Sequence, residues 1–157
     1  MTPRFEVSCE KRLIGNKLTM SLARYNVGDL WRTFLPRRKE ITNSLTNELI
    51  SMVIYPPGYF AKFDPSNEFE RWAAVEVSDL VNIPENMETF ILESGLYAVF
   101  DYKGSDANSF FTHIFTVWLP DSGYQLDDRP HFEVLGAKYI NGDPNSEEEI
   151  WIPVKPK

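Results

Sequence analysis

Hydrophobic and polar residues alternate along most of the chain, which is the pattern of half-buried β-strands. Valine, isoleucine and aromatic residues are frequent in these stretches, and breakers such as "PPG" at 56–58 separate them. The chain is therefore predicted to be rich in strands. The expected strands cover residues 4–22, 48–55, 68–77, 89–94, 95–104, 131–136 and 148–154.

Two stretches change to the helical period. In residues 30–35 the apolar positions form one helical stripe, and Pro36 predicts that this helix kinks or ends there. A second apolar face with helical spacing covers residues 110–118. Ser105 is expected to cap this second helix, with Asp106 in its first turn.

The two halves of the chain resemble each other. "LWRTFLP" at 30–36 and "IFTVWLP" at 114–120 both end an aromatic-rich helix in Leu-Pro, 84 positions apart. With an offset of 79 positions, "FERWAAV" and "EEIWIPV" also align. The matched residues are Glu70 with Glu149 and Trp72 with Trp151.

This repeat predicts the architecture. Each half contains a strand, a helix and two further strands, and neither half covers its own sheet, so we expect the halves to pack as a pseudo-twofold pair. The predicted fold class is α+β, with antiparallel sheets and one main helix per half. Residues 1–157 would form a single domain, with pseudo-repeats at about 1–80 and 88–157.

Composition and charge narrow the function. Of the 157 residues, 43% are hydrophobic and 14% aromatic, which is the composition of a globular chain. The aromatic residues are numerous enough both to fill a core and to line a site for flat ligands. The net charge of −7 argues against binding of nucleic acid, which depends on clustered Lys and Arg. The basic run 37–39 is followed at once by Glu40. We interpret it as a solvated helix end, with a docking patch as the alternative.

Cys9 is the single cysteine, so no intrachain disulfide can form, which favours a cytoplasmic location. It lies in an alternating segment, and a buried, unreactive thiol is expected there. The N-terminus has no apolar core of signal-peptide length, and no apolar run is long enough to span a membrane. The sequence therefore predicts a cytoplasmic protein that does not bind membranes.

The strand "HFEVLG" at 131–136 carries a carboxylate in its middle. Glu133 alternates with Phe132 and Val134, so it faces the other side of the sheet. Two interpretations remain open: Glu133 points into water, or it looks into a cavity that requires a negative charge. A carboxylate taken out of water has a raised pKa or acquires a partner, and a ligand cation can be that partner.

The tryptophans offer candidate walls for such a cavity. In "EEIWIPV", Glu149 and Trp151 lie on the face opposite to three aliphatic residues that suit a helix-packed core. Glu70 and Trp72 repeat this arrangement, so two Trp–Glu pairs would form opposite walls of one cleft. The alternatives are a solvated Glu149 and core positions for both tryptophans. Looser candidates for the cleft are Tyr97 and Tyr59, and the tryptophans expected in the core are Trp31 and Trp118.

Four segments resemble, in order, the signatures of the GyrI-like small-molecule-binding domain, which is also the effector-binding part of many AraC-type and MerR-type multidrug regulators. The segments are "YAVFDYKG", "WLPDSGY", "HFEVLG" and "EIWIPVK". The resemblance is strong over residues 95–157 and weaker over 1–94. It implies a duplicated βαββ fold with a cleft between the halves, which takes lipophilic, often cationic aromatic compounds and has Glu133 as its central acid. The family usually has an aromatic residue two positions later, where this chain has Leu135.

Three functions follow from this resemblance. The first is a stand-alone module that binds or sequesters drugs or effectors, since nothing in the chain suggests a helix-turn-helix. The second is a hydrolase that opens cyclopropane rings of genotoxic natural products, with Glu133 as general acid or base. The third is an inhibitor of a protein partner, as the family's name indicates for DNA gyrase. No cofactor or metal is expected, since the only histidines are His113 and His131 and no phosphate-binding loop occurs.

Overall fold

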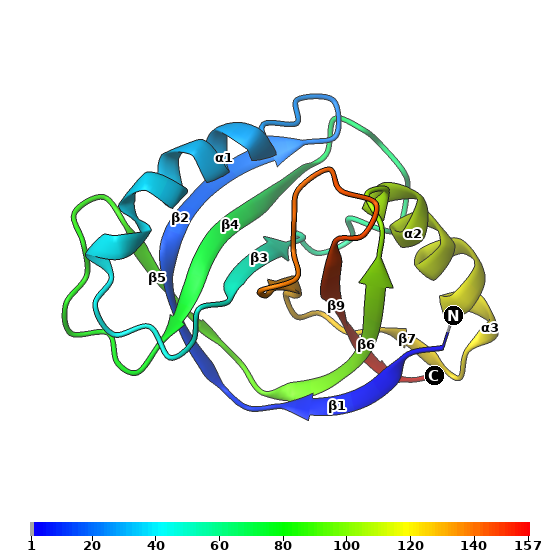
Figure 1. The fold of residues 1–157 in the computed structure, drawn as a ribbon. Coiled ribbons are helices and arrows are strands. Elements are labelled where there is room, and N and C mark those ends of the chain that lie inside the picture. Colours follow the sequence, from blue (N-terminus) through cyan, green and yellow to red (C-terminus); the bar gives the residue numbers. More distant parts are fainter. Residues whose placement is uncertain (1) are drawn as a thin grey trace.

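The computed structural model describes residues 2–157, so Met1 of the predicted domain lies outside the described residues. The strands form a strongly curved antiparallel sheet with helices on its outside, and the fold is α+β as predicted (Figure 1). The strands are β1 (Arg4–Ser8), β2 (Lys11–Ser21), β3 (Leu49–Ile54), β4 (Glu68–Val77), β5 (Glu88–Leu92), β6 (Gly95–Lys103), β7 (Tyr124–Leu126), β8 (His131–Leu135) and β9 (Glu147–Pro156). The helical segments are α1 (Val27–Phe34), the 3-10 turn η1 (Leu35–Glu40), α2 (Ala107–His113), the π-helical turn η2 (Ile114–Trp118) and α3 (Leu119–Asp121).

The two halves have the same order of elements. The first half runs β2-α1-β3-β4 and the second β6-α2-β8-β9, and the strands are arranged as β2-β4-β3 and β6-β9-β8. β3 pairs with β8 in antiparallel fashion and joins the halves at the centre of the sheet. The expected order of elements is therefore present, while the origin of the halves by duplication stays a prediction.

The inner face of the sheet encloses a hydrophobic cluster contributed by both halves. Trp72, Tyr97 and Phe132 in this cluster are each at most 2% exposed. The edge strand β1 pairs with β6 of the second half and continues along the chain into β2 of the first. In the same way, β5 pairs with β2 and continues into β6, so the sheet closes around the cluster. Figure 1 shows β1 and β2 as one continuous arc.

The outer face carries the helices, one on each flank. α1 packs on Ala73 and Val75 of β4, and α2 with η2 packs on Ile150 and Ile152 of β9. Between the two helices lies β3 (Figure 1), which pairs with β8. The outer face of these two strands supplies no buried residue to either helix-packed cluster, and we call it the central seam.

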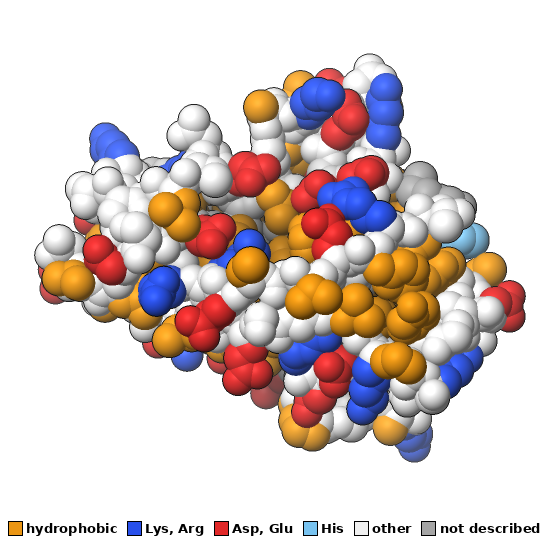
Figure 2. Space-filling view, turned by 90° about the horizontal axis from the view of Figure 1, so that it is seen from below, with side chains coloured by type: hydrophobic (Ala, Val, Ile, Leu, Met, Phe, Trp, Pro, Cys, Tyr) orange, Lys and Arg blue, Asp and Glu red, His pale blue; other side chains and the backbone are white. Residues whose placement is uncertain are grey.

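β1 fastens the N-terminal segment to the second half. Arg4 donates hydrogen bonds to Asp101 at 2.9 Å and to Glu149 at 2.6 Å. Phe5 stacks on Tyr124 with ring centroids 4.6 Å apart, and it remains 42% exposed. Figure 2, which views the molecule from below Figure 1, shows hydrophobic side chains gathered on one part of that face. β1 thus continues into β2 of one half while it pairs with β6 of the other.

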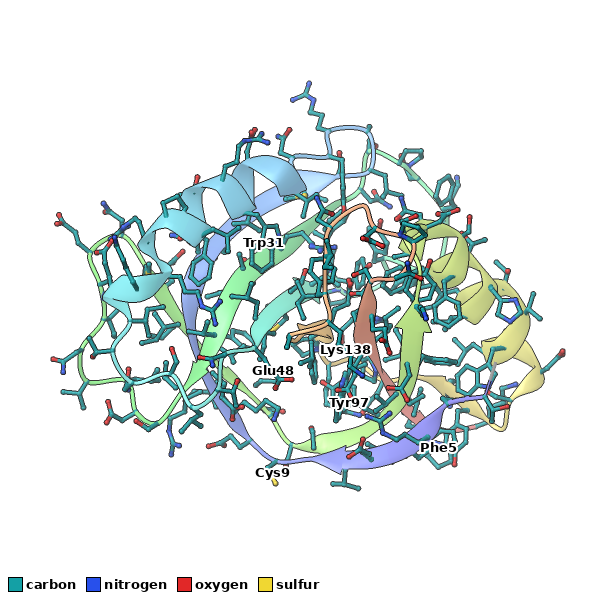
Figure 3. All side chains as sticks on the ribbon, viewed as in Figure 1. Phe5, Cys9, Trp31, Glu48, Tyr97 and Lys138 are labelled. Carbon is teal, nitrogen blue, oxygen red and sulfur yellow. The ribbon has the colours of Figure 1, made fainter. Side chains whose placement is uncertain are left out.

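Two local expectations are wrong. The second helix is capped by Asp106 and not by Ser105, because the Asp106 carboxylate accepts a hydrogen bond from the Ser109 backbone N–H at 3.1 Å. Cys9 is exposed and not buried. It lies in the connection between β1 and β2, where no ladder partner fixes the alternation of faces, and Figure 3 shows it at the outer edge of the arc.

Gly15→Ala is expected to destabilise the fold, because a methyl group at this position of β2 has no room. The added Cβ would lie 2.7 Å from the Cα of Ala74 and nearer still to the carbonyl oxygen of Ala73. Overpacking of this kind costs about 1–3 kcal/mol. Urea unfolding should show the loss, with Gly123→Ala as the control, since a methyl group there meets nothing within 4 Å. An unchanged unfolding midpoint for Gly15→Ala would contradict the tight approach of β2 to β4.

Candidate functional site

A cavity of about 1330 Å³ lies over the central seam. This volume exceeds the roughly 300–1,000 Å³ of most ligand pockets, so a drug-sized ligand has room in it. Trp31 of α1 borders it on one side and Phe111 of α2 on the other, while the segments 55–64 and 139–142 contribute further walls. Figure 3 shows Trp31 on the side of α1 that faces the sheet. The space that the two helices leave uncovered is therefore a cavity of ligand size.

One end of the cavity is built from aromatic rings. The ring of Tyr55, just beyond β3, has its centroid 4.6 Å from that of Tyr59 and 4.7 Å from that of Phe60. His131 lies 5.0 Å from Tyr55, and Phe115 of η2 lies 5.5 Å from Phe60. We call this group the aromatic wall. Its members are Tyr55, Tyr59, Phe60, Phe69, Phe115 and His131.

The rings of the aromatic wall are uncharged at neutral pH. Burial, and after it the charge of Arg129, lowers the pKa of His131 to about 3, so the imidazole is neutral. Burial raises the pKa of Tyr55 and of Tyr59, so both phenols keep their protons. The wall therefore presents neutral ring faces, and the negative centre of such a face attracts a cation.

Two carboxyl groups project into the same cavity. Glu133 of β8 pairs with Ile150 of β9, and Glu148 lies two residues before Ile150, so both acids project from the outer face as diagonal neighbours. Burial, followed by a hydrogen bond with Glu133 and the charge of Glu133, raises the pKa of Glu148 to about 9. We call these two residues the carboxyl pair.

Arg71 of β4 brings a positive charge to this cavity. Its guanidinium donates a hydrogen bond to Ser51 Oγ at 2.7 Å, and Ser51 stands opposite Glu133 in the pairing of β3 with β8. The charge of Arg71 lowers the pKa of Glu148, but burial and Glu133 have the larger effect. With both carboxyls ionised, the carboxyl pair and Arg71 together carry one negative charge.

Three of the residues expected from the sequence line the cavity, namely Glu133, Tyr59 and Trp151. Glu133 projects into it from its floor, and Tyr59 belongs to the aromatic wall. Leu135 also lines the cavity, two positions beyond Glu133 on the same face. An aliphatic side chain therefore occupies the place where the family usually has an aromatic one, and the rings come from the β3–β4 connection and from η2.

The two predicted Trp–Glu pairs do not form opposite walls of this cavity, since only Trp151 of their four residues lines it. Trp72 lies in the inner cluster, where its indole N–H donates to Glu70 at 2.7 Å. The indole N–H of Trp151 donates to Glu149 at 3.2 Å. Trp151 borders the cavity, but its ring stacks on Phe132 of the inner cluster with centroids 5.1 Å apart.

Tyr97 also belongs to the inner face. It is fully buried, and its hydroxyl donates to the carbonyl oxygen of Pro130 at 2.8 Å. The position of the cavity relative to the helices explains these placements. The alternation of residues correctly put Trp151 on the face opposite to Ile150 and Ile152, which pack under α2. The cavity, however, opens on the face that carries the helices, and not on the opposite face as expected.

Several residues at the cavity were missed by the sequence analysis. Glu148 shares its face with Ile150 and Ile152, so an acid in line with core aliphatic residues was the available signal. Trp31 was expected in the core, and it both contacts Phe34 at 6.0 Å between centroids and borders the cavity. The other residues missed are Arg71, Tyr55, Phe60, Phe69 and Phe115.

Residues 2–157 contain neither a cluster of metal-ligating side chains nor a membrane-spanning helix. No group of three or more His, Cys, Asp or Glu side chains in this part of the chain is placed to hold a metal ion. No helix within the same residues is both long and apolar enough to span a bilayer.

Several solved structures share this fold. The C-terminal domain of EcmrR superposes with a TM-score of 0.70 at 14% identity, over 98% of this chain and 97% of that one. SAV2435 bound to tetraphenylphosphonium gives a TM-score of 0.67 at 18% identity, over 99% and 94% of the two chains. A hydrolase of Listeria innocua, encoded by lin2189, gives 0.60 at 10% identity, over 98% and 92%. At these identities the likeness establishes the fold.

The sequence also matches known proteins. The transcriptional regulator BrlR of Pseudomonas aeruginosa is 31% identical over 131 residues, which are 82% of this chain and 46% of BrlR. The chain thus spans about half the length of this curated relative. The model of the GyrI-like small molecule binding domain matches residues 1–155. With the fold and the cavity described above, the chain belongs to the family of GyrI-like small-molecule-binding domains.

Proposed function

We propose that the protein binds lipophilic, cationic aromatic compounds in the cavity over the central seam, as a drug- or effector-binding module. The observation that carries this proposal is the presence of the carboxyl pair and the aromatic wall in one cavity. The ligand would place its positive charge near Glu133 and lay its rings against Tyr55 and its neighbours.

The energetics of binding favour ligands that are positively charged and flat, and they discriminate little between ligands of different shape. A buried carboxylate has lost solvation worth several kcal/mol, and a ligand cation restores part of it. A cation over a ring face gains about 0.5–2 kcal/mol more. Stacking needs a flat face and few directional bonds, so many scaffolds fit equally well. The cavity is therefore expected to accept a range of flat cations.

The relatives support the same ligand class. SAV2435, which shares the fold, is bound to tetraphenylphosphonium, a lipophilic cation with four phenyl rings. BrlR is a transcriptional regulator, and this chain covers less than half of it. The present chain would supply the ligand-binding part of such a system, or act by sequestering the compound.

Glu133→Gln should weaken the binding of tetraphenylphosphonium about tenfold, a loss of about 1.4 kcal/mol, because the substitution removes a negative charge from the cavity floor. A neutral compound such as triphenylphosphine oxide should lose little affinity. Titration calorimetry measures both. Glu149→Gln, on the inner face of the neighbouring strand, is the matched control and should bind like the wild type. Equal losses for the cation and the neutral compound would contradict the electrostatic account.

Phe60→Leu should also weaken this binding, by about threefold to tenfold, because the aromatic wall loses a ring that contacts Tyr55 and Phe115. Phe60 is 47% exposed, so the fold should tolerate the change. Phe5→Leu removes a ring of similar exposure outside the cavity and serves as the control. Unchanged affinity for Phe60→Leu would remove this ring from the site.

A hydrolase is the second candidate, and one observation favours it. A carboxyl whose pKa is raised, as that of Glu148 is, can act as a general acid near neutral pH. The fold is shared with a hydrolase of Listeria innocua. On this reading a cyclopropane-containing genotoxic compound would be the substrate, and Glu133 would orient or activate water. Turnover of such a compound that survives Glu133→Gln unchanged would exclude Glu133 from catalysis.

The third candidate, an inhibitor of a protein partner, has the least support. Its one visible docking element is the basic run at 37–39. Arg37 already pairs with Glu40 at 2.7 Å and donates to the carbonyl oxygen of Glu85 at 2.5 Å. This side chain is thus engaged within the chain, which favours the solvated helix end over a docking patch.

A further inference from the structure

We infer that the carboxyl pair makes the cavity a cation–proton exchange site, in which an entering lipophilic cation displaces a proton held between Glu133 and Glu148. The inference rests on the proposed function and adds its regulation. The exchange is balanced, because the proton passes to solvent and the cation takes its place, so the net charge of the cavity stays the same.

The geometry holds the two acids in one low-dielectric space. Glu133 and Glu148 come from adjacent strands and point from the same face, since Glu133 pairs with Ile150 and Glu148 precedes Ile150 by two residues. Glu148 Oε2 is buried and has no hydrogen-bond partner among residues 2–157. Two half-buried carboxylates in this position repel each other, and one proton between them removes the repulsion.

The groups that face the pair do not neutralise it. From β4, Arg71 brings one positive charge, but its guanidinium donates to Ser51 Oγ at 2.7 Å. From the loop after β8, Tyr139 has its pKa raised by burial and by the charges of the two acids, so it stays neutral. From β3 and β8, Tyr55 and His131 are also neutral, for the reasons given above. Arg71 therefore offsets one carboxylate, and the second requires either a proton or a ligand cation.

The charge balance gives the direction of the pH dependence. In the empty cavity, burial and Glu133 raise the pKa of Glu148 from an ordinary value near 4.5 to about 9, so the pair holds a proton at neutral pH. A bound cation favours the ionised form and releases that proton. Affinity for the cation should then increase with pH between these two values, by at most tenfold per pH unit. A single ordinary carboxylate would give constant affinity over most of that range.

Titration calorimetry with tetraphenylphosphonium tests the exchange. At pH 7.5 the binding enthalpy should differ between phosphate and Tris buffers, because Tris takes up the released proton with a large enthalpy. The difference should correspond to about one proton per ligand. Affinity should also increase from pH 6 to pH 9. An enthalpy that is independent of the buffer, with clear binding, would overturn the inference and leave the proposed function intact.

Glu148→Gln provides the decisive comparison. The variant should lose both the buffer dependence of the enthalpy and the increase in affinity with pH, because no second carboxyl remains to share a proton with Glu133. Glu149→Gln, which changes an acid on the opposite face, should keep both. An unaltered proton release in Glu148→Gln would assign the proton to another group and overturn the inference.

A measurement without ligand separates this inference from the proposed function. A carboxyl with a raised pKa binds more protons in the folded than in the unfolded state, so its contribution to stability falls as pH increases. The urea midpoint of the wild type should therefore drop further between pH 6 and pH 9 than that of Glu148→Gln. An equal drop would refute proton holding by the pair. Absence of tetraphenylphosphonium binding would overturn both the cation exchange and the proposed function, whatever the stability data show.

Discussion

The antiparallel pairing of β3 with β8 is the constraint on which the site depends. It joins the two halves and places Ser51 opposite Glu133 at the centre of the sheet. In each half the helix packs over the flank, so the pairing creates a seam that neither helix covers. A shift of this register by one residue would turn Glu133 toward the hydrophobic inner cluster and away from the cavity. The same hydrogen bonds therefore set the position of the cavity and of its charge.

The sequence predicted the elements well because their signals are local. β4 spans residues 68–77 as expected, and the chain passes from α1 to a 3-10 turn next to Pro36. Alternation and helical period depend on a few neighbouring residues, and tertiary packing did not override them. The short strand β7 was not predicted, and the other errors fell at element ends. The choice of Asp106 as cap and the exposure of Cys9 are set by single-residue geometry outside the periodic segments.

The site was only partly predictable, and for a different reason. Alternation separated Trp151 from Ile150, but it does not say which face of a sheet carries a cavity. That depends on where the helices stop, which is a long-range property. Glu133 was predicted from a family motif. Glu148 lies in the acidic run 147–149, where the sequence alone does not tell which of the three glutamates faces the cavity. The aromatic wall was hidden similarly, since its rings come from separate elements.

Burial of the carboxyl pair increases both its affinity for a lipophilic cation and its affinity for a proton. The loss of solvation that makes a carboxylate attractive to a lipophilic cation also increases its affinity for a proton. Arg71 weakens both effects, because it lowers the pKa of Glu148 and repels a cation. The neutral rings around Tyr55 act differently, since a ring face attracts a bound cation but does not bind a proton. Selection of organic cations over protons therefore has to come from the aromatic wall, while the carboxyl pair selects the sign of the charge.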